Sequence, residues 1–180
     1  MTYAVVPHNP LWKQAFGVEA AALQAALGVN AAKLHHIGST AIPNILAKPI
    51  IDILIEVSSL PQVDARASRM HALGYEVMGA FGIPGRRFFR KFDGMGTRTH
   101  HVHIFQQGSA HVARHLAFRD LLITHPQKAQ GYSQLKADIT RDGDISWEDY
   151  LDGKDPFIKE TEGQALAWFS FSRIAAARLK

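Results

Sequence analysis

Apolar residues in the first third of the chain recur at two different periods. Between residues 10 and 27 they return every three or four positions, the period of an amphipathic helix, and Asn9-Pro10 marks its start. Shorter apolar runs over 33–37 and 50–57 have the length of strands, and glycine and proline interrupt the pattern between them. We therefore expect one helix followed by two strands.

The helical period returns once before the pattern changes to alternation. Residues 61–73 predict a second helix, which Gly74 ends. After it, short segments of strand-forming residues, separated by glycine-rich turns, predict three further strands, over 75–78, 86–92 and 99–105.

From about residue 109 the pattern is helical again. We expect helices over 110–124, 126–141 and 154–178. This order lacks the regular strand-helix alternation of parallel α/β proteins. It predicts an α+β fold, in which a mixed β-sheet is flanked by helices and the C-terminal half is helical.

Length and composition fit one domain of ordinary size. The chain has 180 residues, 47% of them hydrophobic, which is enough for a single core. We expect one domain over residues 1–180, with an α/β core over 1–108 and a helical part over 109–180. The N-terminus lacks the basic and apolar regions of a signal peptide, and no apolar run reaches 18 residues. We expect a cytoplasmic protein with no membrane partner.

The charge and the absence of cysteine narrow the chemistry. Lys plus Arg number 20 against 16 Asp plus Glu, a formal charge of +4 that favours anionic ligands. No block of five or six like charges occurs, which argues against nucleic acid as a partner. Without cysteine, disulfides, thiol catalysis and cysteine-bound zinc are excluded.

The segment from His36 to Thr40, followed by a strand that carries one acid, has the composition of a phosphate and metal site. Gly38 allows close approach of the backbone, and Ser39 or Thr40 can donate a hydroxyl to a phosphate oxygen. An ordinary turn or helix cap explains Gly-Ser-Thr equally well. Asp52, inside an apolar strand, requires a metal, a hydrogen bond or a charge partner.

Two histidines on a later strand are candidate partners for Asp52. His101 and His103 share one face of the strand over 99–105. With Asp52 they would form a metal site whose nitrogen ligands suit manganese, iron or zinc better than magnesium. Two other interpretations stay open. One histidine packs in the core while the other bonds Asp52 without a metal, or one of them, His103 in particular, transfers a proton.

Several basic and aromatic residues are candidates for binding the rest of a phosphorylated ligand. Two arginines share a strand face, a lysine precedes the strand of Asp52, and a tyrosine and a lysine stand four residues apart on a predicted helix. Exposed surface charges explain each of them as well. With the glycine-serine-threonine segment, the candidate substrate-binding residues are Gly38, Ser39, Thr40, Lys48, Arg86, Arg90, Arg119, Tyr132 and Lys136.

A combination of segments resembles the GrpB family. The resemblance runs from about residue 7 to 167 and is carried mainly by His36-Ile-Gly-Ser-Thr-Ala-Ile-Pro43, Ala47-Lys-Pro-Ile-Ile-Asp-Ile53, His101-Val-His103 and His115-Leu-Ala-Phe-Arg-Asp120. That family is similar in fold to the nucleotidyltransferase superfamily. The resemblance implies a nucleotidyltransferase-like sheet, a nucleotide or other phosphorylated small molecule as partner, and a divalent metal, magnesium or manganese with zinc as a further choice.

One departure from the superfamily pattern leaves two functions open. The superfamily places a second acid two residues after the first, where this chain has Leu54, and Glu56 lies roughly 13 Å from Asp52 along the strand. The first function is metal-assisted transfer of a nucleotidyl group from a nucleoside triphosphate to an unknown acceptor, with Asp52 and His103 as catalytic residues. The alternative is a non-catalytic module that binds a nucleotide or a CoA-type ligand on a degenerate transferase scaffold.

Overall fold

The computed structural model describes residues 4–141, 143 and 145–177. Its first element, α1 (Leu11–Leu27), confirms the predicted helix and ends at Gly28, whose φ of 60° is a conformation that glycine adopts without strain. The buried face of α1 carries Trp12, Leu23 and Leu27, which pack against the sheet.

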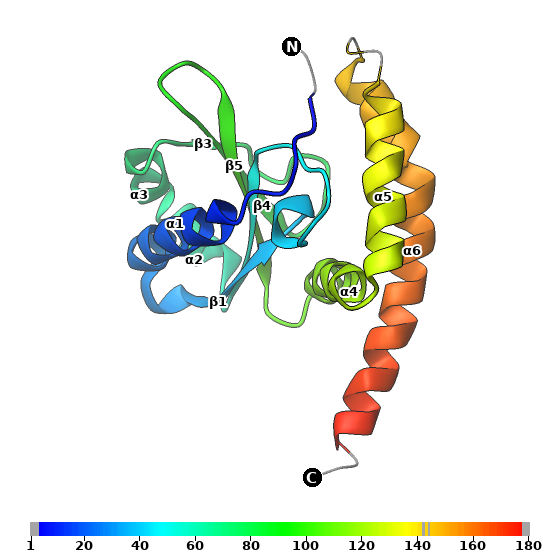
Figure 1. The fold of residues 1–180 in the computed structure, drawn as a ribbon. Coiled ribbons are helices and arrows are strands. Elements are labelled where there is room, and N and C mark those ends of the chain that lie inside the picture. Colours follow the sequence, from blue (N-terminus) through cyan, green and yellow to red (C-terminus); the bar gives the residue numbers. More distant parts are fainter. Residues whose placement is uncertain (1–3, 142, 144, 178–180) are drawn as a thin grey trace.

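Five strands form one mixed sheet. Their order is β1-β2-β5-β4-β3, and β2 and β5 run parallel while the other neighbouring strands run antiparallel. This sheet, with helices on both sides, confirms the predicted α+β fold class (Figure 1). The strands are β1 (Ala31–Ile37), β2 (Ile51–Val57), β3 (Tyr75–Val77), β4 (Arg86–Phe92) and β5 (Arg98–Gln106).

One face of the sheet is covered by α1 and two short helices, α2 (Leu60–Asp64) and α3 (Ala67–Ala72). The prediction of one continuous helix over 61–73 is therefore wrong. The helix breaks at Arg66, whose φ of −109° and ψ of 13° leave the helical range. The guanidinium of Arg66 donates a hydrogen bond of 2.6 Å to the Leu27 carbonyl at the end of α1, a tertiary contact that the periodicity does not reveal.

The opposite face is covered by the C-terminal helices. In Figure 1, α4 (Ala110–Thr124) lies next to the sheet, and α5 (Pro126–Ile139) and α6 (Trp147–Ala177) lie beyond it. Buried apolar residues of the sheet and α4 form a cluster that includes Leu54 and Phe105. Among the described residues, no helix is both long and apolar enough to span a bilayer.

The last helix begins earlier than the sequence predicted. It starts at 147 rather than 154, and the predicted end at 178 lies outside the described residues. Ser146 caps the start, since its hydroxyl accepts a bond of 3.0 Å from the Asp149 backbone N–H and donates one of 2.6 Å to the Asp149 carboxylate. Pro156, inside the helix, does not end it. The earlier start brings two further turns of α6 to the site described next.

Candidate functional site

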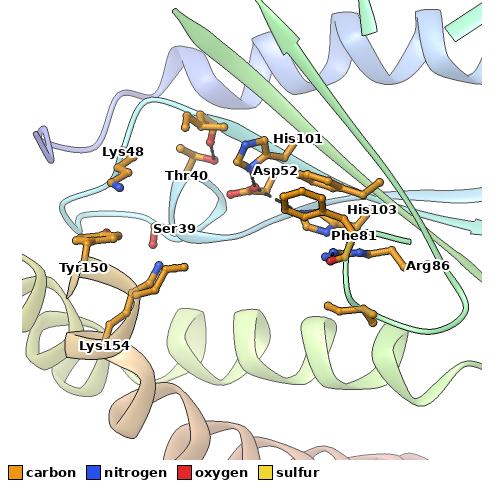
Figure 2. A pocket seen from close by; sticks show the side chains of 14 residues that line it. Ser39, Thr40, Lys48, Asp52, Phe81, Arg86, His101, His103, Tyr150 and Lys154 are labelled. Atoms are coloured by element: carbon orange, nitrogen blue, oxygen red, sulfur yellow. Dashed lines mark hydrogen bonds and ion pairs between the residues drawn. The ribbon is translucent and has the colours of Figure 1, made fainter. Parts of the chain in front are cut away.

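The parallel pairing of β2 and β5 brings the acid-bearing strand beside the histidine-bearing strand. Asp52 lies opposite His101 in the register, and His103 follows two residues later on the same face. Oδ1 of Asp52 is 3.1 Å from Nδ1 of His101 and 3.8 Å from Nε2 of His103 (Figure 2). One donor atom from each of the three residues lies within 4.8 Å of the other two, so the group can share one cation.

The surroundings favour an ionised carboxylate on Asp52 and a neutral imidazole on His103. Burial by itself raises the pKa of Asp52, but the hydrogen bond from His101 and the nearby ring of His103 outweigh it and hold this pKa well below its ordinary value. Burial lowers the pKa of His103. Nε2 of His101 and Nδ1 of His103 are buried without a hydrogen-bond partner among the described residues. Asp52 therefore offers an anionic oxygen to a ligand, and His103 offers an uncharged nitrogen.

Gly38 is required where the chain leaves β1. Its φ is 70°, and a Cβ at this position would lie 2.4 Å from Oδ2 of Asp52. The next residues, Ser39–Ala41, form one turn of 3-10 helix. The Thr40 hydroxyl is hydrogen-bonded to His36 Nε2 at 2.9 Å and donates to the Ile50 carbonyl at 3.3 Å. This network holds the glycine-serine-threonine turn against the carboxylate of Asp52.

A cavity of about 480 Å³ opens beside Asp52, His101 and His103. Three cationic side chains line it, namely Lys48, Arg86 and Lys154, and we call it the main cavity. In Figure 2, Lys48 and Lys154 lie with Tyr150 at one end, Phe81 and Arg86 lie at the other, and Asp52 lies between them.

Burial makes Lys48 and Lys154 lose their protons more readily than an exposed lysine. It lowers the pKa of Lys48 to about 7 and also lowers that of Lys154. The ammonium groups stand 3.7 and 4.5 Å from the centre of the Tyr150 ring. An anion in the main cavity would favour the charged form of both lysines, so this end of the cavity is suited to phosphate.

A smaller hollow of about 270 Å³ adjoins the main cavity, and we call it the second hollow. The two share four lining residues, Ser39, Asp52, His103 and Lys154. The remaining lining of the second hollow comes largely from α4, α5 and α6. The carboxylate of Asp52 is therefore accessible from two spaces.

Tyr132 and Lys136 of α5 lie next to the Ser39 turn, and Lys136 does not line the main cavity. Lys136 is 1% exposed, and its ammonium donates to Ser39 Oγ at 3.0 Å and to the Leu46 carbonyl. Burial lowers the pKa of Lys136 to about 7. The Tyr132 ring lines the second hollow but stacks on Phe157, with 4.9 Å between ring centres. Lys136 therefore positions the Ser39 turn.

The arginines predicted to bind substrate have different surroundings. Arg86 lines the main cavity, but its guanidinium donates to the carbonyls of Ala80 and Phe81, at 3.1 and 2.6 Å. Arg90 and Arg119 line neither space. Arg90 pairs with Glu76 at 2.6 Å, and Arg119 pairs with Asp120 at 2.7 Å and donates to the His36 carbonyl at 3.0 Å.

Among the residues of the main cavity that sequence reasoning missed are Tyr150, Lys154 and Phe81. The signal for the first two was a repeated spacing, because Tyr132-Lys136 and Tyr150-Lys154 have the same i, i+4 arrangement and each lysine stands over its tyrosine ring. Phe81 is 57% exposed and has a φ of 44°, which is unusual outside glycine. Its signal was only an aromatic residue within a glycine-rich loop.

Comparisons with known proteins agree with this architecture. Residues 2–164 match the family model described as GrpB protein. The UPF0157 protein YqkA of Bacillus subtilis is 43% identical over 164 residues, which cover 91% of this chain and 47% of YqkA. The chain therefore spans about half the length of that relative.

Two solved structures bear on the fold. GrpB from Enterococcus faecalis is 42% identical, with a TM-score of 0.87 over 92% of this chain and 99% of that one. Cid1 poly(U) polymerase, in a structure bound to MgATP, is 12% identical, with a TM-score of 0.50 over 73% of this chain and 45% of Cid1, a likeness of fold alone. The chain has a nucleotidyltransferase-like fold and belongs to the GrpB family.

Proposed function

We propose that this chain binds a nucleoside triphosphate in the main cavity and transfers its nucleotidyl group to a small acceptor with the help of a divalent cation. The observation that carries the proposal is the convergence of Asp52, His101 and His103 on a cavity whose other charged lining residues are cationic. A triphosphate needs both features, a cation beside the reacting phosphate and positive groups along the phosphate tail.

The lining of the main cavity supports one orientation of the nucleotide. The phosphate tail fits the end with Lys48 and Lys154. The ring of Tyr150 already contacts the ammonium groups of both lysines, so it is not open to a base. Phe81, at the other end, has an exposed ring on which a base could stack. A base stacked on Phe81 would leave the α-phosphate near Asp52, between the two ends.

The residues present fit a divalent cation. Asp52 would supply a carboxylate oxygen and His101 and His103 would supply imidazole nitrogens, and these donors already lie within 4.8 Å of one another. The mixed oxygen and nitrogen set suits manganese or zinc better than magnesium. A cation bound there would neutralise charge on the phosphates and polarise the α-phosphorus.

The transfer itself exchanges one bond for another at the α-phosphorus. An acceptor hydroxyl or amine forms a bond to the α-phosphorus, the bond from that phosphorus to the bridging oxygen breaks, and pyrophosphate leaves. The acceptor loses one proton. His103, which lines both spaces, is the base that we predicted from the sequence as an alternative to its role as a cation ligand, because the ring nitrogen that binds a cation cannot also accept a proton. Its role as base stays a prediction.

A comparison of two acids on one strand tests the proposal. Asp52 and Glu56 share a face of β2, but Glu56 pairs with His35 at 2.9 Å, away from the main cavity. Thermal shift and pyrophosphate release are measured with ATP, CTP, GTP and UTP, each with manganese or magnesium. We expect metal-dependent stabilisation of the wild type and of Glu56→Gln, and its loss in Asp52→Asn. An unchanged shift in Asp52→Asn contradicts the metal role.

One observation favours a second function, a non-catalytic binding module. Leu54 stands where the superfamily pattern has a second acid, and it is 0% exposed within an apolar cluster. The chain therefore has one strand carboxylate at the site instead of two. Under this alternative, a triphosphate or dephospho-coenzyme A stabilises the protein without metal, and no pyrophosphate is released.

A further inference from the structure

The second hollow differs from the main cavity in its lining. Four of its lining side chains are apolar or aromatic, namely Ile37, Phe118, Tyr132 and Ile158. Its remaining charged pair is Arg114 with Glu162, whose side chains lie 2.5 Å apart and are partly buried. The second hollow therefore has an apolar and aromatic part beside a group of charged and polar side chains, namely Asp52, His103, Arg114, His115, Lys154 and Glu162.

The balance of charge also differs between the two spaces. The main cavity has three cations, Lys48, Arg86 and Lys154, against the single carboxylate of Asp52. In the second hollow, Arg114 and Lys154 face Glu162 and Asp52, so that two cations meet two anions. Electrostatic complementarity favours an anion in the main cavity and a molecule without net charge in the second hollow.

We propose that the second hollow binds the acceptor, and that this acceptor is a small neutral or zwitterionic molecule with an apolar body and a free hydroxyl or amine. This inference rests on the proposed function, because the two spaces share Asp52 and His103 and a nucleophile in one meets a phosphate in the other. A volume of about 270 Å³ accommodates a small molecule and excludes an oligonucleotide.

Two residues of α6 allow each space to be filled separately. Leu151 lines the main cavity alone and Ile158 lines the second hollow alone, and they stand seven residues, or about two helical turns, apart. The variants Leu151→Trp and Ile158→Trp therefore make the same change on the same helix. The probes are phenylalanine, phenylalaninol and 2-phenylethanol, detected by saturation-transfer NMR, and ATP with manganese, detected by calorimetry.

We expect opposite patterns in the two variants. Ile158→Trp should weaken binding of the small probes by at least about tenfold and leave ATP binding unchanged, and Leu151→Trp should do the reverse. Absence of binding of all three small probes to the wild type at millimolar concentration overturns the inference, as does equal binding to the wild type and Ile158→Trp. If ATP does not bind the wild type but Ile158→Trp still loses the probes, the proposed function fails and the second hollow remains a ligand site.

A variant that conserves volume keeps the test valid if Ile158→Trp does not fold. Glu162→Gln breaks the ion pair with Arg114 without filling the second hollow. We expect it to weaken phenylalanine and phenylalaninol, whose ammonium groups lose a carboxylate partner, and to leave 2-phenylethanol unchanged. Equal binding of all three probes to Glu162→Gln and the wild type contradicts the charge argument and overturns the inference.

Discussion

The two faces of the sheet carry different kinds of side chain although the same strands build both. Toward α1, α2 and α3, the residues Ile53, Ile55, Val102 and Ile104 are all 0% exposed and form one apolar cluster. Toward α4, α5 and α6, the residues that alternate with them along the strands include the acid and the histidines of the candidate site.

This difference shows how one strand serves stability and chemistry at once. Because successive side chains of a strand point to opposite faces, Asp52 and Ile53 are neighbours in sequence but belong to different parts of the molecule. We call the face toward α1, α2 and α3 the first face and the face toward α4, α5 and α6 the second face. Replacements on the first face should change the free energy of unfolding, and replacements on the second face should change ligand binding. Four predictions test this separation.

The largest effect is expected from Ile53→Ala. The side chain is 0% exposed between β2 and the helices of the first face, so its truncation leaves a cavity. We expect a loss of about 2–5 kcal/mol in the free energy of unfolding, measured by urea denaturation. Asp52→Asn, the adjacent change, should alter the denaturation midpoint less and ligand binding more. An Ile53→Ala variant as stable as the wild type would contradict the claim that the first face of the sheet supplies stability.

A pair of glycines separates backbone strain from the site. Gly38→Ala places a Cβ 2.4 Å from Oδ2 of Asp52 at a φ of 70°, whereas Gly96→Ala has a φ of 77° and nothing within 4 Å. Both should cost about 1–2 kcal/mol of stability, because an L-residue is strained in this conformation. Gly38→Ala alone should also lose metal-dependent nucleotide binding, measured by thermal shift. Equal binding by the two variants would show that the carboxylate position is unimportant.

The stability of the protein should depend on pH through Lys136, the buried lysine of α5, which lies on the second side of the sheet. The pKa of Lys136 is lowered by burial to about 7 from 10.5, so the unfolded chain binds more protons between these values. The penalty for burying this lysine is complete below pH 7, and stability rises as the pH increases from 7 to 10.5, by up to about 1.4 kcal/mol per pH unit.

Lys136→Met should flatten this rise in stability, measured by denaturation at a series of pH values. Lys48 and Lys154, whose pKa values are also lowered by burial, would account for the slope that remains. Lys13→Met, on an exposed position of α1, is the control. A slope in Lys136→Met identical to that of the wild type would contradict the assignment.

The smallest effect is expected from Arg87→Ala. Arg87 and Asp64 form an ion pair of 2.6 Å whose side chains are 27% and 50% exposed, and such pairs contribute about 0–1 kcal/mol. The adjacent Arg86 is 7% exposed and holds the loop of Phe81, so Arg86→Ala should weaken nucleotide binding, measured by calorimetry. A larger loss of nucleotide affinity in Arg87→Ala than in Arg86→Ala would contradict the assignment of ligand binding to the second face.

Much of the fold could be predicted from the sequence because strands and long helices have periodic patterns. The strands over 33–37, 50–57, 86–92 and 99–105 are present with shifts of no more than two residues at their ends. The break at Arg66 and the start of α6 could not be predicted in this way, since a contact with Leu27 and a cap at Ser146 decide them.

For the candidate site, the sequence alone determined which residues could take part and which of them share a face of a strand, because alternation is a local property of the backbone. Packing of the whole chain makes β2 and β5 parallel neighbours and brings Tyr150 and Lys154 to the main cavity. It also gives Arg90 and Arg119 partners other than a ligand. The environment of a charged side chain depends on groups far away in the sequence, and the packing of the chain brings these groups together.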